Sequence, residues 1–430
     1  MVSRRRFLQT ASLAASVSVA LPALAEAAEG DQSLPPALAA LRTLRAEARP
    51  ITVEERAARQ ENARRLMLMR ENNLSAILLT PSTSLAYFTG IRWEGGERLF
   101  AMVLPAKGEA FYVSPAFEEG RAREQIAQSP EGGNSDLRVW QEDESPYARV
   151  AQGLSDRGIA SGTVGIEETV KFVFSDNLRK AAPSATFTSA TPVTAGCRMI
   201  KSRHEIDLMR LAAKVTLAAY EATYRSLKAG MTQHDVENML EAAHRQLGFE
   251  GGADVQVGEY SSFPHGSVKP QEIQEGTIVM IDGGCSVEGY QSDITRTFVL
   301  GKASDKMKQV FEIVHRAQSA ALAAAKPGVD AGSVDAAARK VITDAGYGPD
   351  YKYFTHRLGH GMGMDGHEWP YLVRGNPTTL EPEMTFSDEP GIYIRGEFGI
   401  RLEDDMHIME GGAELFTPQS PSLENPFAKP

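Results

Sequence analysis

The stretch that decides the fold of this chain is TIVMIDGGCSVEGYQSDITRTF, residues 277–298. An apolar run ends on Asp282, and an alternating run follows Asp293 after a turn around Gly289. This pattern predicts a β-hairpin that brings the two acids side by side. A single acid at a strand end is commonly a turn residue or a cap. Two unpaired carboxylates on a buried hairpin are costly to desolvate, so the pair predicts a bound cation.

A glycine-rich segment further along carries three histidines. Residues 356–368 read HRLGHGMGMDGHE and include His356, His360 and His367. The glycine spacing argues against a helix, so His356 and His360 are not a helical zinc pair. Glycine lets the backbone approach a ligand closely. A lone histidine is more often a hydrogen-bonded structural residue, but three in one such loop predict a functional site.

A second predicted hairpin supplies two more acids. TFSDEPGIYI, residues 385–394, contains Glu389, and IRLEDD, residues 400–405, contains Glu403. Oxygen donors with a single imidazole suit a pair of manganese-type cations better than a lone tetrahedral zinc. Two such cations about 3.5–4 Å apart hold and activate one water for hydrolysis. The candidate metal ligands are Asp282, Asp293, His360, Glu389 and Glu403.

Taken together, these motifs resemble the signature set of the creatinase, aminopeptidase P and prolidase family, which includes methionine aminopeptidase. The resemblance implies an α/β (α+β) protein with two domains. A smaller N-terminal creatinase-like α/β domain is expected over residues 51–195. A "pita-bread" catalytic domain, in which two similar α/β halves enclose two metals, is expected over residues 196–425. Methionine aminopeptidases usually lack the N-terminal domain, so the resemblance favours the Xaa-Pro branch.

The same resemblance implies a role for each ligand. Asp282 binds the first metal, Asp293 and Glu403 bridge the two metals, and His360 and Glu389 bind the second. Creatinase keeps the fold without metals. All five ligand positions are intact in this sequence, which argues against a metal-free protein.

Catalytic and substrate-binding roles follow from the resemblance and from general chemistry. His265 and His367 match two histidines that contact the substrate and the tetrahedral intermediate. Glu389 can take a proton from the attacking water and pass it to the leaving nitrogen. Either histidine can donate a hydrogen bond to the developing oxyanion. Arg401 and His356 match positions that support the ligands, and Arg401 is also expected to bind substrate.

The expected function is cleavage of the N-terminal Xaa-Pro bond of short peptides through a metal-bridging hydroxide. The expected metal is Mn²⁺, with Co²⁺ or Zn²⁺ as alternatives. A dipeptidase also needs a cation for the C-terminal carboxylate of its substrate, and Arg374 is a candidate, with an exposed loop residue as the alternative. Two other functions stay open. The scaffold could act as a lyase or hydrolase on a small metabolite, or as a catalytically silent binding module.

Composition restricts the partners. The chain has 430 residues and a net charge of −11, which disfavours nucleic acid and anionic membranes. Short proline-containing peptides are the expected partners, together with further copies of the chain in a homodimer or homotetramer. Only Cys197 and Cys285 occur, and two free buried thiols are expected rather than a disulfide.

The N-terminus predicts export. Arg4, Arg5 and Arg6, followed by Phe7 and Leu8, precede a weakly apolar stretch with a small-x-small cleavage site. This is the pattern of a twin-arginine signal peptide over residues 1–25, which predicts a periplasmic or secreted protein without integral membrane association after cleavage. The alternative is a basic tail followed by a core helix. An Ala- and Pro-rich flexible leader is expected over residues 26–50.

Overall fold

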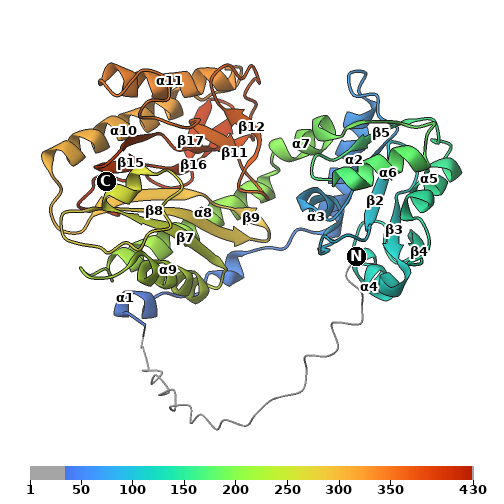
Figure 1. Ribbon diagram of the computed structural model, residues 1–430, viewed down its shortest axis with the longest axis horizontal. Coiled ribbons are helices and arrows are strands. Elements are labelled where there is room, and N and C mark those ends of the chain that lie inside the picture. The colour runs from blue at the N-terminus through green and yellow to red at the C-terminus, as the bar shows by residue number, and fades with distance from the viewer. Residues whose placement is uncertain (1–33, 429–430) are drawn as a thin grey trace, which may run out of the picture. The chain divides into compact units, whose positions relative to one another are not determined.

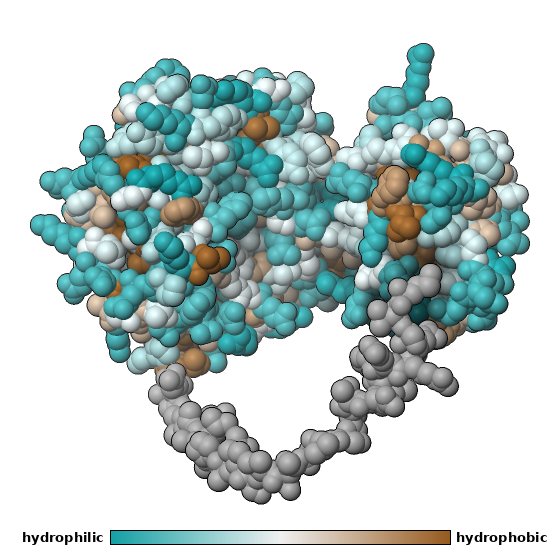
Figure 2. Space-filling model, in the orientation of Figure 1, coloured by the Kyte–Doolittle hydropathy of each residue, from teal (hydrophilic) through white to brown (hydrophobic). Residues whose placement is uncertain are grey.

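The structure, a computed structural model, describes residues 34–428 (Figure 1). The predicted signal peptide, residues 1–25, and the first part of the predicted leader lie outside the described residues. Within the described part, no helix is long and apolar enough to cross a membrane. Most side chains on the face shown in Figure 2 are hydrophilic, with scattered apolar patches.

The described part of the predicted leader differs from the flexible segment expected over residues 26–50. Helix α1 (Pro36–Ala39) contacts α8 (Arg203–Tyr224) and α9 (Gln233–Leu247), and its Leu38 is completely buried. Lys214 on α8 forms an ion pair with Glu47 at 2.8 Å. Burial of one apolar side chain and this ion pair therefore attach residues 36–50 to the catalytic domain.

The N-terminal domain is built on a six-stranded sheet with the order β4-β3-β2-β1-β5-β6. Strand β1 pairs antiparallel with β2 and parallel with β5. The strands are β1 (Ala76–Leu79), β2 (Ala101–Pro105), β3 (Phe111–Pro115), β4 (Asp136–Trp140), β5 (Thr163–Ile166) and β6 (Thr186–Ser189).

Helices cover both faces of this sheet, which explains why β1 is apolar at every position. Ala76 and Leu78 belong to the core shared with α5 and α6, whereas Ile77 and Leu79 belong to the core shared with α2, α3, α4 and α7. Successive side chains of a strand point to opposite faces, so both faces must be apolar. The helices are α2 (Val53–Leu68), α3 (Thr83–Thr89), α4 (Glu119–Ile126), α5 (Pro146–Asp156), α6 (Phe172–Ala181) and α7 (Thr191–Met199).

The first half of the catalytic domain packs two helices on a sheet of order β10-β8-β7, with β9 paired to β8. Val236 and Leu240 of α9 share a buried core with Val279 and Ile281 of β8. The elements are α8 (Arg203–Tyr224), α9 (Gln233–Leu247), β7 (Gly251–Val257), β8 (Ile278–Val287), β9 (Tyr290–Gln291) and β10 (Ile294–Val299).

The second half repeats this arrangement with α10 and α11 against a sheet of order β12-β11-β13-β16-β17, and with the hairpin β14-β15 (Figure 1). The predicted α/β class and its two helix-backed halves are confirmed. The elements are α10 (Asp305–Ala324), α11 (Ala331–Asp344), β11 (Gly359–Gly361), β12 (Glu368–Leu372), β13 (Thr385–Asp388), β14 (Gly391–Ile394), β15 (Phe398–Arg401), β16 (Asp404–Met409) and β17 (Gly412–Leu415).

Strand pairing in both halves positions the acids. In the predicted first hairpin, Asp282 of β8 lies opposite Thr295 of β10, and Asp293 immediately precedes β10. Glu389 directly follows β13, and Glu403 lies between β15 and β16. The four acids therefore come from strands or strand ends rather than from mobile loops.

Candidate metal centre

All five predicted metal ligands line one cavity of about 320 Å³. His265 and His367, predicted from the resemblance to contact substrate, line the same cavity, as do His356 and Arg401. The complete lining is Pro264, His265, Asp282, Asp293, His356, Arg357, His360, His367, Glu389, Arg401 and Glu403.

The donor atoms of the five residues form two overlapping groups. Asp282, Asp293 and Glu403 make one group, and His360, Glu389 and Glu403 make the other, with donor atoms within 4.8 Å of one another in each. Because Glu403 belongs to both, the cavity can hold two cations that share a carboxylate. The two groups contain all five predicted ligands and no other residue.

Burial disfavours the ionised form of three acids in this cavity, Asp293, Glu389 and Glu403. It raises the pKa of Asp293 to about 8, with the charge of Asp282 as a further cause. Burial likewise raises the pKa of Glu389 to about 8, an effect that Arg401 opposes and Asp293 reinforces. Burial and the charge of Asp293 raise the pKa of Glu403 well above its usual range. Bound cations would favour the ionised forms of these acids, so the residues fit a metal centre.

His360 presents an unprotonated nitrogen to the acids. Its Nδ1 lies 3.1 Å from the carbonyl oxygen of Gly361 and donates to it. Burial lowers the pKa of His360 to about 3, so the ring is neutral and Nε2 carries the lone pair. That Nε2 lies 3.4 Å from Glu389 and 3.8 Å from Asp293. An acceptor nitrogen facing carboxylate oxygens is unfavourable unless a proton or a metal cation lies between them.

His367 has the opposite tautomer. Its Nδ1 accepts a hydrogen bond from Nη2 of Arg357 at 2.9 Å. Burial lowers the pKa of His367, with Arg357 as the next cause, so the ring is neutral and its proton is on Nε2. Its ring stacks on that of His360, with centroids 3.8 Å apart. His367 could also join Asp293 and His360 in a third donor group, but a protonated Nε2 favours hydrogen-bond donation over metal ligation.

Arg401 and Tyr393 connect the ligands to His356. Nη1 of Arg401 donates to the hydroxyl of Tyr393 at 2.9 Å, and this hydroxyl donates to Nε2 of His356 at 2.7 Å. Nδ1 of His356 in turn donates to the carbonyl oxygen of Arg357. This chain of hydrogen bonds fixes the orientation of His356 beside the cavity.

His265 is placed by the loop before β8. The carbonyl oxygen of its neighbour Pro264 accepts a hydrogen bond from Nη1 of Arg401 at 3.1 Å. Arg401 is buried, and Asp282 is the main group that stabilises its charge. The arginine predicted to bind substrate therefore contacts a ligand and a loop, and holds His265 at the cavity wall.

Arg374 does not line the cavity. Its guanidinium is half exposed and forms an ion pair with Asp350 at 2.8 Å. This placement corresponds to the alternative considered from the sequence, a loop residue on the surface.

Arg357 is a cation in the cavity wall that the sequence analysis missed. It lines the cavity, and its guanidinium lies 4.1 Å from the ring centroid of Tyr371. Its position next to His356 in the histidine motif was the available signal.

Thr295 was also missed. Its hydroxyl lies within hydrogen-bonding distance of both Asp282 and Glu403, so it orients two ligands from the strand opposite Asp282.

Cys197 and Cys285 are both free and buried in the described part of the chain. Two unpaired thiols are what the sequence analysis expected.

Comparison with known proteins agrees with this geometry. The family model for metallopeptidase family M24 matches residues 207–410, and that for the creatinase/prolidase N-terminal domain matches residues 59–200. A putative dipeptidase, YkvY, from Bacillus subtilis is 33% identical over 353 residues, which cover 81% of this chain and 95% of that protein. An Xaa-Pro dipeptidase from Lactobacillus delbrueckii subsp. lactis is 32% identical and covers 83% of this chain and 96% of its own length.

Solved structures give the same result. Dipeptidase PepE from Mycobacterium ulcerans has a TM-score of 0.81 and 33% identity, over 87% of this chain and 99% of its own. The fold and the clustered donors define a metal-dependent peptidase with a pita-bread catalytic domain. The chain belongs to metallopeptidase family M24, and the resemblance drawn from its motifs is confirmed.

Proposed function

We propose that this chain is an Xaa-Pro dipeptidase that uses two divalent metal ions. The observation that carries the proposal is the pair of three-donor groups that share Glu403. Relatives named Xaa-Pro dipeptidase that match nearly their whole length support the substrate class. Carboxylate oxygens with one imidazole nitrogen support Mn²⁺ as the metal, ahead of Co²⁺ and Zn²⁺.

Divalent cations bound in the cavity would supply Lewis-acid catalysis and lower the pKa of a coordinated water towards ~7. The residues of the chain then have separate tasks. Glu389 accepts a proton from the attacking water and passes it to the proline nitrogen as the bond breaks. His367 donates from Nε2 to the developing oxyanion, because Arg357 already engages its Nδ1.

Arg357 supports the dipeptidase assignment over the aminopeptidase one. It lies in the wall of the metal cavity, where a guanidinium can bind the C-terminal carboxylate of a two-residue substrate. Arg374 is engaged by Asp350 away from that cavity. A longer peptide has no carboxylate at this distance from the scissile bond and would gain nothing from Arg357.

The test is a mass-spectrometric screen of Xaa-Pro dipeptides against Xaa-Pro-Xaa tripeptides, with Mn²⁺-loaded and metal-stripped protein. We expect cleavage of dipeptides only in the loaded protein. Arg357→Gln should raise KM for dipeptides about tenfold or more, as for loss of a charge-assisted pair. Arg374→Gln is the matched control and should leave KM unchanged. Faster cleavage of tripeptides than dipeptides would exclude the dipeptidase assignment.

The proposed compartment is the periplasm or the exterior. The support for this proposal is the arginine-rich N-terminus and comes from the sequence alone, because the structure does not describe residues 1–33. Export by the twin-arginine route carries folded proteins, so the metals could be loaded before transport.

A further inference from the structure

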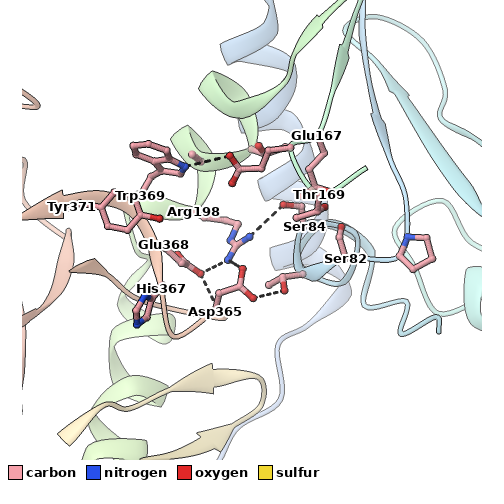
Figure 3. Close-up of a pocket in the computed structure, with 15 residues that line it drawn as sticks. Ser82, Ser84, Glu167, Thr169, Arg198, Asp365, His367, Glu368, Trp369 and Tyr371 are labelled. Carbon is pink, nitrogen blue, oxygen red and sulfur yellow. Dashed lines mark hydrogen bonds and ion pairs between the residues drawn. The ribbon is translucent and has the colours of Figure 1, made fainter. Parts of the chain in front are cut away.

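A second cavity, shown in Figure 3, shares His367 with the lining of the metal centre. Its volume is about 390 Å³. One wall comes from the catalytic domain, with Trp369 and Tyr371 of β12. The other comes from the N-terminal domain, with Glu167 and Glu168 after β5. The two cavities therefore adjoin at His367.

Two of the acids in this cavity are already neutralised. Arg198 forms ion pairs with Asp365 and Glu368, as Figure 3 shows. Lys201 lies 3.5 Å from Glu368 and adds a second cation behind the wall. Among the described residues that line the cavity, Arg198 is the only lysine or arginine. The guanidinium of Arg198 already pairs with Asp365 and Glu368.

In the described part of the chain neither Glu167 nor Glu168 forms an ion pair, and of the two only Glu167 is buried, since Glu168 is exposed to solvent. Glu167 is only 5% exposed, and its Oε2 has no hydrogen-bond partner in the described part of the chain. Glu168 accepts only long hydrogen bonds, from Nε1 of Trp369 at 3.4 Å and from Thr191 at 3.5 Å. A nearly buried carboxylate without a partner is costly, which indicates that a ligand supplies the missing donor.

The aromatic side of the cavity suits the same kind of ligand. Trp369 is 43% exposed, although its ring lies beside that of Tyr371 with centroids 4.7 Å apart. An exposed indole face binds a guanidinium or ammonium group, most strongly when water is excluded. A nearly buried carboxylate without a partner, a second carboxylate exposed to solvent and the partly exposed Trp369 together select a cation with an alkyl stem.

We infer that this cavity binds the cationic side chain of an arginine or lysine at the N-terminal position of the substrate peptide. The inference rests on the proposed function for one step only: in an Xaa-Pro dipeptide, the proline ring has no charge, and Xaa carries the side chain that varies. The enzyme then prefers Arg-Pro and Lys-Pro to dipeptides with a neutral first residue. Glu167 and Glu168 are the residues that determine this specificity.

The direct test measures binding without any cleavage. L-argininamide and L-citrullinamide share an α-amine and a similar shape, and only the first has a charged side chain. Isothermal titration of the Mn²⁺-loaded protein should show argininamide binding at least about tenfold more tightly. Glu167→Gln and Glu168→Gln should each reduce this ratio severalfold. Glu124→Gln, which removes an exposed carboxylate on α4, is the matched control and should preserve it.

Equal affinity for the two amides in the native protein would overturn the inference, as would an unchanged ratio in both glutamine variants. Thermal melting shows whether each glutamine variant is folded. If one variant does not fold, the affinity ratio of the other variant tests the inference. A kinetic comparison of Arg-Pro with citrulline-Pro should show the same preference in kcat/KM. Failure to cleave any Xaa-Pro dipeptide would refute the proposed function but not this inference, because the titration measures the preference of the cavity for a cationic side chain without any cleavage.

Discussion

Arg401 donates from Nη2 to Oδ2 of Asp282 at 2.6 Å, although its own side chain is only 3% exposed. The other oxygen of Asp282 accepts from Thr295 at 2.9 Å. One guanidinium thus fixes the first ligand by a short hydrogen bond and lies 3.9 Å from Glu403, yet the pKa values of Asp293, Glu389 and Glu403 are still raised. The carboxylate of Asp282 is therefore held in one orientation. The acids of the cavity together carry more negative charge than Arg401 offsets, and bound cations can neutralise the remainder.

Asp293→Asn should reduce bound metal from two ions per chain to less than one and reduce peptidase activity to background. A neutral amide in place of the carboxylate between Asp282 and His360 removes charge from both ions at once. Metal content by plasma mass spectrometry and turnover of an Xaa-Pro dipeptide measure the two effects. Asp143→Asn, at an exposed position, is the control. Two ions per chain with normal turnover in the Asp293 variant would refute the ligand assignment.

His367→Ala should keep the metals and lower kcat by roughly 10²–10³-fold, as expected for loss of one hydrogen bond to the oxyanion. The reason is that Nδ1 is engaged by Arg357, so Nε2 is the donor. His234→Ala, on the exposed side of α9, is the control. A loss of metal in parallel with activity would show that His367 is a ligand, through the third donor group.

His244 should make the protein less stable in mild acid. It is completely buried on α9, and burial lowers its pKa below the ordinary 6.5. Below about pH 6.5 the unfolded chain binds a proton there that the folded chain does not, so stability is fully present above that pH and falls as the pH drops. One such proton changes the free energy of unfolding by at most about 1.4 kcal/mol per pH unit.

His244→Leu should therefore flatten the decrease in stability between about pH 6.5 and pH 5. Urea unfolding of the variant and the native protein at several pH values in this interval measures the difference in slope. His234→Leu is the control and should leave the slope unchanged, because this histidine is largely exposed. Parallel curves for the His244 variant and the native protein would contradict the prediction.

Replacing Arg4 and Arg5 with lysine should keep the protein in the cytosol, uncleaved and active. Lysine preserves the charge, so a general electrostatic role would survive, whereas a receptor that reads the guanidinium pair would not bind. Cell fractionation and mass measurement of the product provide the test. A shortened form outside the inner membrane at normal yield would exclude the twin-arginine route.

The sequence by itself determined the fold class, the family and the five candidate ligands. Each ligand lies in a short motif whose backbone pattern is local: Asp282 and Asp293 on one hairpin, and His360 among glycines. Hairpin pairing follows from turn chemistry and strand alternation, which nearby residues encode. The amino-acid pattern alone therefore suffices to predict that Asp282 and Asp293, on the two strands of one hairpin, lie side by side.

Only the tertiary structure decided which side chains from distant elements meet. It put Arg357 in the metal cavity and Arg374 on the surface, and it attached residues 36–50 to the catalytic domain. It also placed Glu167 and Trp369 around one cavity, although they belong to different domains. Such contacts depend on packing between elements far apart in the chain, and a local sequence pattern carries no record of the partner.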